Sequence, residues 1–186
     1  MRATAPGQSA VLLLDTIDVL NKRGIPYAIV GAFAASFYGV VRASLDADAV
    51  ISAHTAQDIA DLCADLRAQQ LTVTHRRGDR NDPIAAVIDI EDRFHNKVDL
   101  LIGIRGTTAE IFQRTKTARF KGSAIKIVSP EDFIALKIFA GSPRDIQDAE
   151  GVLAVSRKSL DIKLLKKLTS QYGRACAKKL ATLLKS

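Results

Sequence analysis

Tryptophan is absent from this chain of 186 residues, and phenylalanine and tyrosine bring the aromatic content to only 5%. Because 47% of the residues are nevertheless hydrophobic, the sequence predicts an ample core built mainly from aliphatic side chains. Long apolar runs are also missing, so we expect neither a signal peptide nor a membrane-spanning helix. The length fits one domain, alone or with a helical tail.

Cysteine is scarce as well. The two cysteines, Cys63 and Cys176, lie far apart in segments with helical patterns. This spacing excludes the cysteine clusters of a zinc site. We therefore expect free, reduced, partly buried thiols and a cytoplasmic location.

Acidic residues are outnumbered by basic ones, 20 to 27, which gives a net charge of +7. This balance favours a polyanionic partner, such as a nucleic acid or a nucleotide. Solubility alone is the other explanation, and the composition does not choose between them. A cationic substrate is disfavoured, because it would need an acidic pocket.

Helix and strand patterns alternate in the first part of the chain, and helical patterns fill the rest. Predicted helices are 8–23, 32–38, 52–70, 130–140 and a pair within 161–185 that breaks at Gly173, and 103–115 is predicted as a loop and a helix that carries Ile111 and Phe112. Predicted strands are 27–30, 46–51, 71–75, 84–90 and 97–102, with a polar loop at 75–83 and a hairpin at 117–128 that turns at Lys121-Gly122. This order predicts an α/β (α+β) fold, with a small mixed sheet flanked by helices in residues 1–128 and a C-terminal helical segment in residues 129–186.

A pair of aspartates, Asp46 and Asp48, precedes the apolar run 49–51. On a strand their side chains point to the same face, where two carboxylates repel unless a cation lies between them. Mg²⁺ is such a cation, because it takes one or two protein carboxylates and completes its shell with waters and phosphates. The alternative is a polar strand edge without a metal.

A glycine, Gly31, separates the apolar strand 27–30 from a helix of small residues. A glycine turn that opens a helix presents backbone N–H groups, which suit a phosphate. A phosphate site beside metal-binding carboxylates is the equipment of phosphoryl or nucleotidyl transfer.

The pattern G-x-x-A…Y-G-x-x-R-x-S-x-D-x-D, from Gly31 to Asp48, resembles the signature of the polymerase-beta-like nucleotidyltransferase superfamily. The similarity extends over roughly residues 8–155 and is closest to small bacterial nucleotidyltransferases of the AbiEii toxin type. Those proteins usually carry Gly-Gly or Gly-Ser where this chain has Gly31-Ala32. Ala32 removes flexibility or a donor, so weak or lost activity is one expected outcome.

The resemblance implies a third carboxylate on a neighbouring strand. Asp99 lies inside the apolar run 97–102, where an acid is costly to bury without a partner. It would join Asp46 and Asp48 around two Mg²⁺ ions and serve as the general base. Asp89 is the rival third acid, because it too lies in an apolar strand.

The resemblance also implies a set of nucleotide-binding residues. Lys137 interrupts the apolar helix 130–140, and either its stem extends to the surface or its ammonium reaches the triphosphate. Arg42 would neutralise phosphate as well, and Ser36 would supply the hydroxyl that Ala32 lacks. The full expected set is Gly31, Ala32, Ser36, Arg42, Ser44 and Lys137, with Asp145 and Asp148 assigned to helix-start and ion-pairing roles as readily as to catalysis.

These residues predict transfer of a nucleoside monophosphate from a nucleoside triphosphate to an acceptor hydroxyl. The AbiEii resemblance implies that the acceptor is a tRNA end or other RNA, and that the protein is a toxin with a cognate antitoxin protein. One alternative is an enzyme that modifies a small antibiotic-type molecule. Another is a catalytically silent module that binds nucleotide or RNA.

The tail 161–185 combines a basic face with apolar residues at helical spacing. Most helices of this kind pack their apolar stripe on the domain. The dense positive face could also bind RNA phosphates or an anionic surface.

Overall fold

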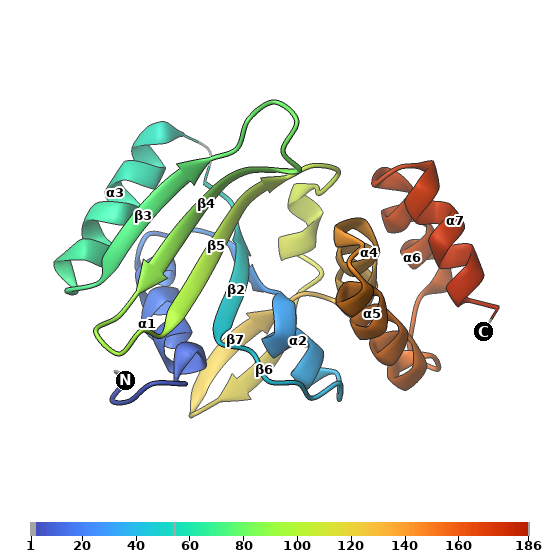
Figure 1. Cartoon of the computed structure of the whole chain (residues 1–186), viewed down its shortest axis with the longest axis horizontal. Helices are drawn as coiled ribbons and strands as arrows, with labels where there is room; N and C mark the ends of the chain where they lie inside the picture. The colour runs from blue at the N-terminus through green and yellow to red at the C-terminus, as the bar shows by residue number, and fades with distance from the viewer. Residues whose placement is uncertain (1–2, 54, 186) are drawn as a thin grey trace.

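A mixed β-sheet forms the centre of the molecule (Figure 1), which we describe from a computed structural model over residues 3–53 and 55–185. Within those residues the sheet has seven strands in the order β3-β4-β5-β2-β1-β7-β6. The strands are β1 (Tyr27–Ile29), β2 (Asp46–Ile51), β3 (Thr72–Arg77), β4 (Ile84–Glu91), β5 (Lys97–Ile104), β6 (Lys116–Phe120) and β7 (Ser123–Ile127). The predicted mixed sheet with flanking helices is confirmed.

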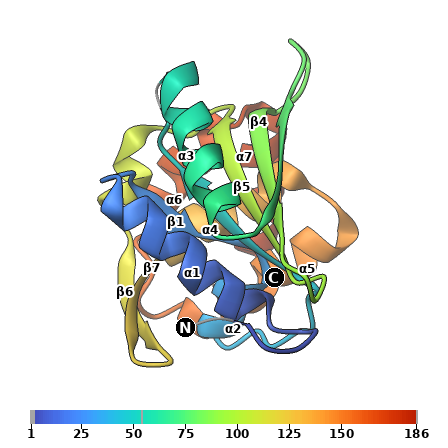
Figure 2. The same ribbon diagram turned by 90° about the vertical axis from the view of Figure 1, so that its left-hand side faces the viewer.

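Helices cover the sheet unequally. They are α1 (Ser9–Lys22), α2 (Gly31–Phe37), α3 (Ala56–Ala68), α4 (Pro130–Ala140), α5 (Pro143–Ser156), α6 (Ile162–Gln171) and α7 (Arg174–Leu183), with a short 3₁₀ turn, η1, at Ala109–Phe112. Figure 2 shows α1 and α3 against one face of the sheet. Figure 1 shows the helices from α4 onward on the side of the molecule opposite α3.

The alternation of side chains along β5 shows how this arrangement leaves a face open. Val98, Leu100 and Ile102 are buried, whereas Asp99 and Leu101 between them are only partly buried. A strand places successive side chains on opposite faces, so the apolar set packs under the helices and the Asp99 set faces outward. The candidate site is built on that outward face.

One predicted boundary was wrong. Strand β3 continues through Arg77, so the predicted polar loop begins later. The strand extends because Arg76 forms paired 2.6 Å hydrogen bonds with Asp89 on β4, which keeps the edge strand in register. Within 103–115 the predicted loop and following helix are found, with the helix as the short η1 turn that carries Ile111 and Phe112.

Two local predictions about turns and caps are confirmed. The hairpin of β6 and β7 turns at Lys121 and Gly122, which both have positive φ. Ser129 caps α4 through a hydrogen bond from the Asp132 N–H, with Pro130 at the first helical position.

The C-terminal helices are tied to the rest of the chain by polar contacts. Arg114, before β6, forms two 2.7 Å hydrogen bonds with the buried Asp132 at the start of α4. One apolar cluster includes both sheet residues such as Leu100 and helical residues such as Phe133 and Leu165.

The division of the chain into two parts at residues 128 and 129 stays a prediction. No helix among the described residues is long and apolar enough to cross a bilayer.

Candidate active site

The three predicted aspartates lie on two adjacent strands. Strands β2 and β5 pair in parallel, and their register places Asp48 opposite Asp99 and Asp46 opposite Lys97. Residues opposite each other in a sheet share a face, and so do residues two apart on one strand. The structure therefore brings Asp46, Asp48 and Asp99 to one face, in the neighbouring arrangement that the resemblance implies.

The aspartate side chains perturb one another. Burial, followed by the negative charges of Asp99 and Asp46, raises the pKa of Asp48 to about 6, although Lys137 and Arg42 oppose the shift. Burial, together with Asp89 and Asp46, also raises the pKa of Asp99. The fold thus holds carboxylates where their own repulsion favours protonation or a bound cation.

Asp89, the rival third acid, stands opposite Asp99 on β4. Its carboxylate is already paired with Arg76, which lowers the pKa of Asp89 through their hydrogen bonds. Asp99 has no such guanidinium partner among the described residues, so it remains the better candidate for the third site carboxylate. The pairing of Asp89 could have been suspected only from the arginine-rich segment 76–80.

Gly31 lies directly against Asp48. The Val30 N–H donates to the Asp48 carbonyl oxygen at 2.9 Å, which fixes the start of α2 beside β2. Gly31 has φ +64°, and a Cβ on it would lie 1.9 Å from Asp48 Oδ2. The position therefore needs glycine both for its backbone conformation and for the space that the carboxylate occupies.

Replacement of Gly31 by alanine is expected to destabilise the protein by at least about 1–3 kcal/mol, the usual cost of a strained backbone position. It should also displace the Asp48 carboxylate. Chemical denaturation measures the stability, and a nucleotide-transfer assay measures the consequence for the site. Gly122→Ala is the matched control, since Gly122 also has positive φ but open space at its Cβ. Equal activity in the two variants would contradict the role of the Gly31–Asp48 contact.

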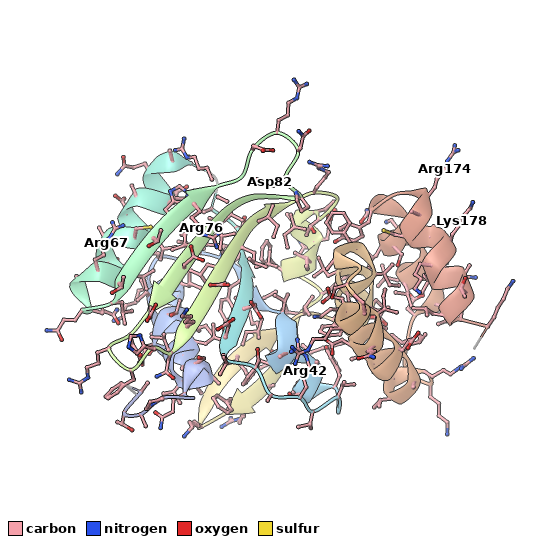
Figure 3. All side chains as sticks on the ribbon, viewed as in Figure 1. Arg42, Arg67, Arg76, Asp82, Arg174 and Lys178 are labelled. Carbon is pink, nitrogen blue, oxygen red and sulfur yellow. The ribbon has the colours of Figure 1, made fainter. Side chains whose placement is uncertain are left out.

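Of the two expectations for Lys137, the one in which its stem extends to the surface is wrong. Its side chain is 11% exposed, and its ammonium lies 2.7 Å from Asp145 Oδ1 and 2.9 Å from Asp148 Oδ2. Arg42 also reaches Asp148, at 3.2 Å, and Figure 3 shows it between the loop before β2 and α5. Asp145 additionally completes the capping box of α5 with Ser142. Asp145 and Asp148 thus both form ion pairs, and Asp145 also caps the helix start, while a part for either in catalysis stays a prediction.

A pocket of about 240 Å³ opens between the outward face of the sheet and α4. Gly31, Asp48, Lys137 and Asp145 form its polar end. The rest of the lining is mainly apolar and comes from β4, β5 and α4: Ile84, Leu101, Ile104, Phe133, Leu136 and Phe139. We call this pocket the cleft. Its apolar members were not among the predicted site residues, although Leu101 lies two residues after Asp99 on the same strand face.

The other predicted nucleotide-binding residues do not line the cleft. Ala32, Ser36, Arg42, Ser44 and Asp46 line a neighbouring hollow beside the start of α1. The Ser36 hydroxyl donates to the Ala32 carbonyl oxygen at 3.0 Å, so in this structure it bonds to its own helix. The sequence pattern could not separate the two hollows, because both are bordered by the segment 31–48.

A third hollow lies on the open sheet face. Asp46, Asp89, Asp99, Glu91, Arg76, Lys97, Thr72 and Thr74 belong to its lining. Asp48 therefore faces the cleft, whereas Asp99 faces the open sheet. The two carboxylates stand at the boundary between two spaces, which suits a reaction between two bound molecules.

The described residues contain no group of three or more His, Cys, Asp or Glu side chains gathered closely enough to hold a metal ion. The set around Asp48 still has the chemistry that Mg²⁺ requires, since it consists of carboxylate oxygens on one sheet face. The raised pKa values of Asp48 and Asp99 show that positive charge there would be stabilising. The predicted ligands Asp46, Asp48 and Asp99 are chemically suited to Mg²⁺, and their role as metal ligands stays a prediction.

The chain is similar to known proteins in sequence and in structure. A protein-family model described as nucleotidyl transferase of unknown function (DUF2204) matches residues 85–185, more than half of the chain. That stretch contains Asp99 and Lys137. It does not include the Gly31–Asp48 segment, which precedes it in the chain. No curated protein sequence matches the chain.

Solved structures share the fold at low sequence identity. The antibiotic-resistance factor ANT(2'')-Ia, studied in solution, is 16% identical with a TM-score of 0.60, over 96% of this chain and 95% of that one. An antigenic nucleotidyltransferase-like protein from Paracoccidioides brasiliensis is 17% identical with a TM-score of 0.54, over 96% and 92%. The lincosamide antibiotic adenylyltransferase LnuA is 11% identical with a TM-score of 0.52, over 82% and 99%.

Proposed function

Because the chain belongs to the family of nucleotidyl transferases of unknown function (DUF2204), we propose that it moves a nucleoside monophosphate from a nucleoside triphosphate to an acceptor hydroxyl. The observation that carries the proposal is the register of Asp48 with Asp99 across β2 and β5, at the boundary of the cleft and the open sheet face. A nucleotide in the cleft and an acceptor on the sheet would meet at these carboxylates.

The polar end of the cleft suits the triphosphate. Lys137 contributes positive charge beside Asp48, and the positive φ of Gly31 lets the backbone approach a phosphate without a side chain in the way. Asp145 and Asp148 hold Lys137 in place, so we assign them a positioning role. Arg42, on the far side of Asp148, extends the positive charge toward the neighbouring hollow.

Asp46, Asp48 and Asp99 would hold two Mg²⁺ ions, which supply charge neutralisation at the transferring phosphate when bound. Burial, and after it the repulsion from Asp99 and Asp46, raises the pKa of Asp48, so positive charge is favoured at this point. Removal of divalent cations with a chelator is therefore expected to stop transfer.

Asp99 is the proposed general base. Without bound cations, burial and then Asp89 and Asp46 raise its pKa, and its carboxylate lines the hollow proposed for the acceptor. It accepts the proton of the acceptor hydroxyl, and the acceptor oxygen bonds to the α-phosphorus. The bond from that phosphorus to its bridging oxygen breaks, and pyrophosphate leaves.

We propose the end of an RNA, such as a tRNA, as the acceptor, in keeping with the net charge of +7. The AbiEii-like toxin role and the antitoxin stay predictions. A small hydroxylated amine is a second candidate, favoured by the carboxylates of Asp46, Asp89, Glu91 and Asp99 around the hollow on the sheet. That acidic lining was not foreseen from the overall basic charge, which disfavours cationic substrates.

The test incubates the protein with each α-labelled nucleoside triphosphate and Mg²⁺, together with either total tRNA or a panel of aminoglycosides. Label on RNA supports the first acceptor, and label on the small molecule supports the second. The Asp99→Asn variant should lose far more transfer than Asp89→Asn, which replaces the acid opposite it. Tight RNA binding without transfer of any nucleotide would support the silent module and contradict the proposal.

A further inference from the structure

The positive charge of this protein is concentrated in its last two helices. Residues 161–186 hold seven of the 27 lysines and arginines but only one of the 20 acidic residues, Asp161. The other 160 residues hold twenty basic and nineteen acidic residues, so they are nearly neutral. A charge of +6 out of +7 thus lies in about a seventh of the chain, which is a localised electrostatic feature.

These basic side chains are exposed. On α6 they are Lys163, Lys166 and Lys167, and on and after α7 they are Arg174, Lys178, Lys179 and Lys185. None of them is in an ion pair with a carboxylate among residues 3–53 and 55–185. Spacings of three and four residues place Lys163, Lys166 and Lys167 on one side of α6. Figure 3 shows Arg174 and Lys178 pointing away from the body of the molecule.

The apolar side of the same two helices is buried inside the fold. Leu165, Leu168, Leu180 and Leu183 are all buried, with at most 5% of their surface exposed. An amphipathic helix that lies on a membrane needs its apolar face free to enter the lipid. The exposed side carries the basic residues and none of the large exposed apolar side chains of the described residues, which favours a phosphodiester backbone over a bilayer.

The basic helices are fixed to the rim of the cleft through Tyr172, which joins α6 to α7. Its ring stacks on Phe139 of α4 with 4.7 Å between centroids, and its hydroxyl lies 2.8 Å from that of Thr107. Phe139 lines the cleft itself. Gly106 packs against the same ring, since a Cβ there would lie 2.8 Å from Tyr172. Helices α6 and α7 therefore lie next to the cleft.

We propose that the exposed faces of α6 and α7 form a docking surface for the phosphodiester backbone of a nucleic acid strand. Resting on the function proposed above, this surface holds the acceptor strand so that its hydroxyl-bearing end enters the site beside Asp99. Specificity for sequence is not expected from such contacts, because lysine and arginine bind phosphate irrespective of the base. The contacts instead supply affinity that depends on salt.

The experiment compares two triple variants of the full chain. Lys163, Lys166 and Lys167 on α6 are replaced by glutamine, a good helix former. In the control, Lys116, Arg119 and Lys121 of the β6–β7 hairpin, which lies away from α6 and α7 (Figure 1), are replaced by glutamine. Both variants lose the same charge, so a difference between them reports location. Binding of labelled single-stranded RNA, and of DNA of equal sequence, is measured without nucleotide at several salt concentrations.

The affinity of the native protein should fall with salt, with a log–log slope of about 0.7 per phosphate contact on a single strand. The α6 variant should lower the slope by about 2 and weaken binding about tenfold or more near 0.1 M salt. The β6–β7 variant should stay within about threefold of the native protein. The RNA and DNA arms identify which strand is the natural source of the backbone.

Equal binding by the two variants would overturn the docking surface, and so would binding only to vesicles that contain phosphatidylserine. Binding of a non-hydrolysable nucleoside triphosphate is measured in parallel and should be unchanged in the α6 variant. If that variant still transfers label to a small acceptor while RNA fails to bind the native protein, the docking surface is wrong and the proposed function stands. If RNA binds at α6 but no label moves to any acceptor, the proposed function fails separately.

Discussion

Replacement of Asp48 by asparagine is expected to remove nucleotidyl transfer, by about a thousandfold, and at the same time to stabilise the protein at neutral pH. The partly buried carboxylate of Asp48 also faces the charges of Asp99 and Asp46, so burial and then these charges raise its pKa to about 6. Asparagine has the same shape without the charge. Asp48, which the site needs most, therefore lowers the stability of the folded protein.

The direction of the pH effect follows from that pKa. A carboxyl whose pKa is higher in the folded state binds its proton more tightly there, so stability falls as the pH rises from about 4 to about 6. A pKa raised from 3.8 to about 6 corresponds to a loss of about 3 kcal/mol in the free energy of unfolding once the carboxyl is ionised. We therefore expect Asp48→Asn to raise the free energy of unfolding by about 1–3 kcal/mol at pH 7. Near pH 4 and below, the two proteins should be equally stable.

Urea denaturation of native protein and variant at pH 4, 5, 6 and 7 measures this difference. Asp46→Asn is the matched control, because Asp46 lies on the same strand face but is exposed. It should impair transfer yet change stability by no more than about 0.5 kcal/mol. Loss of stability in Asp48→Asn, or transfer within tenfold of the native rate, would contradict the place of Asp48 in the site.

Replacement of Lys137 by methionine is expected to destabilise the protein by about 3 kcal/mol and to reduce transfer strongly. Lys137 is buried and bonds to both Asp145 and Asp148, so its loss leaves the partly buried Asp145 without its lysine partner and the buried Asp148 with Arg42 alone. Arg42 still pairs with Asp148, so Asp145 is the carboxylate more affected by the loss of the Lys137 ammonium. Methionine keeps the apolar stem, so the packing around α4 is preserved.

A double variant separates the structural effect of Lys137 from its effect at the site. Burial would raise the pKa of Asp145, but hydrogen bonds from Lys137 and Ser142 outweigh it and lower that pKa overall. Asp145→Asn in the Lys137→Met background removes the orphaned charge and keeps a side-chain oxygen for the α5 cap. The double variant should recover much of the stability without recovering transfer.

The pH dependence provides a further check on the same pair. A lowered pKa for Asp145 means that its contribution to stability is present above the ordinary aspartate pKa and is lost as the pH falls through the folded value. The stability difference between native protein and Lys137→Met should therefore shrink in acid. Recovery of transfer in the double variant would show that Lys137 acts only as a counterion for Asp145 and would contradict its place beside the triphosphate.

The local elements were largely predictable, because they depend on interactions between residues close in sequence. Hydrophobic spacing gave α1, α4 and the strands β4 and β5 within a few residues. Ser129, Pro130 and Gly173 marked helix boundaries through capping and backbone freedom. The errors arose where a distant partner decides, as with Arg76, which lies in a strand because Asp89 pairs with it across the sheet.

By itself, the sequence determined that Asp46 and Asp48 share a strand face, that Gly31 opens a helix before them, and that the last helices are basic, since period and composition are local properties. Only the tertiary structure decided that Asp99 stands opposite Asp48, that Lys137 turns inward to Asp145 and Asp148, and that the predicted nucleotide-binding residues divide between two hollows. Strand order and helix docking set these contacts, because they minimise exposed apolar area and unpaired buried charge over the whole chain at once.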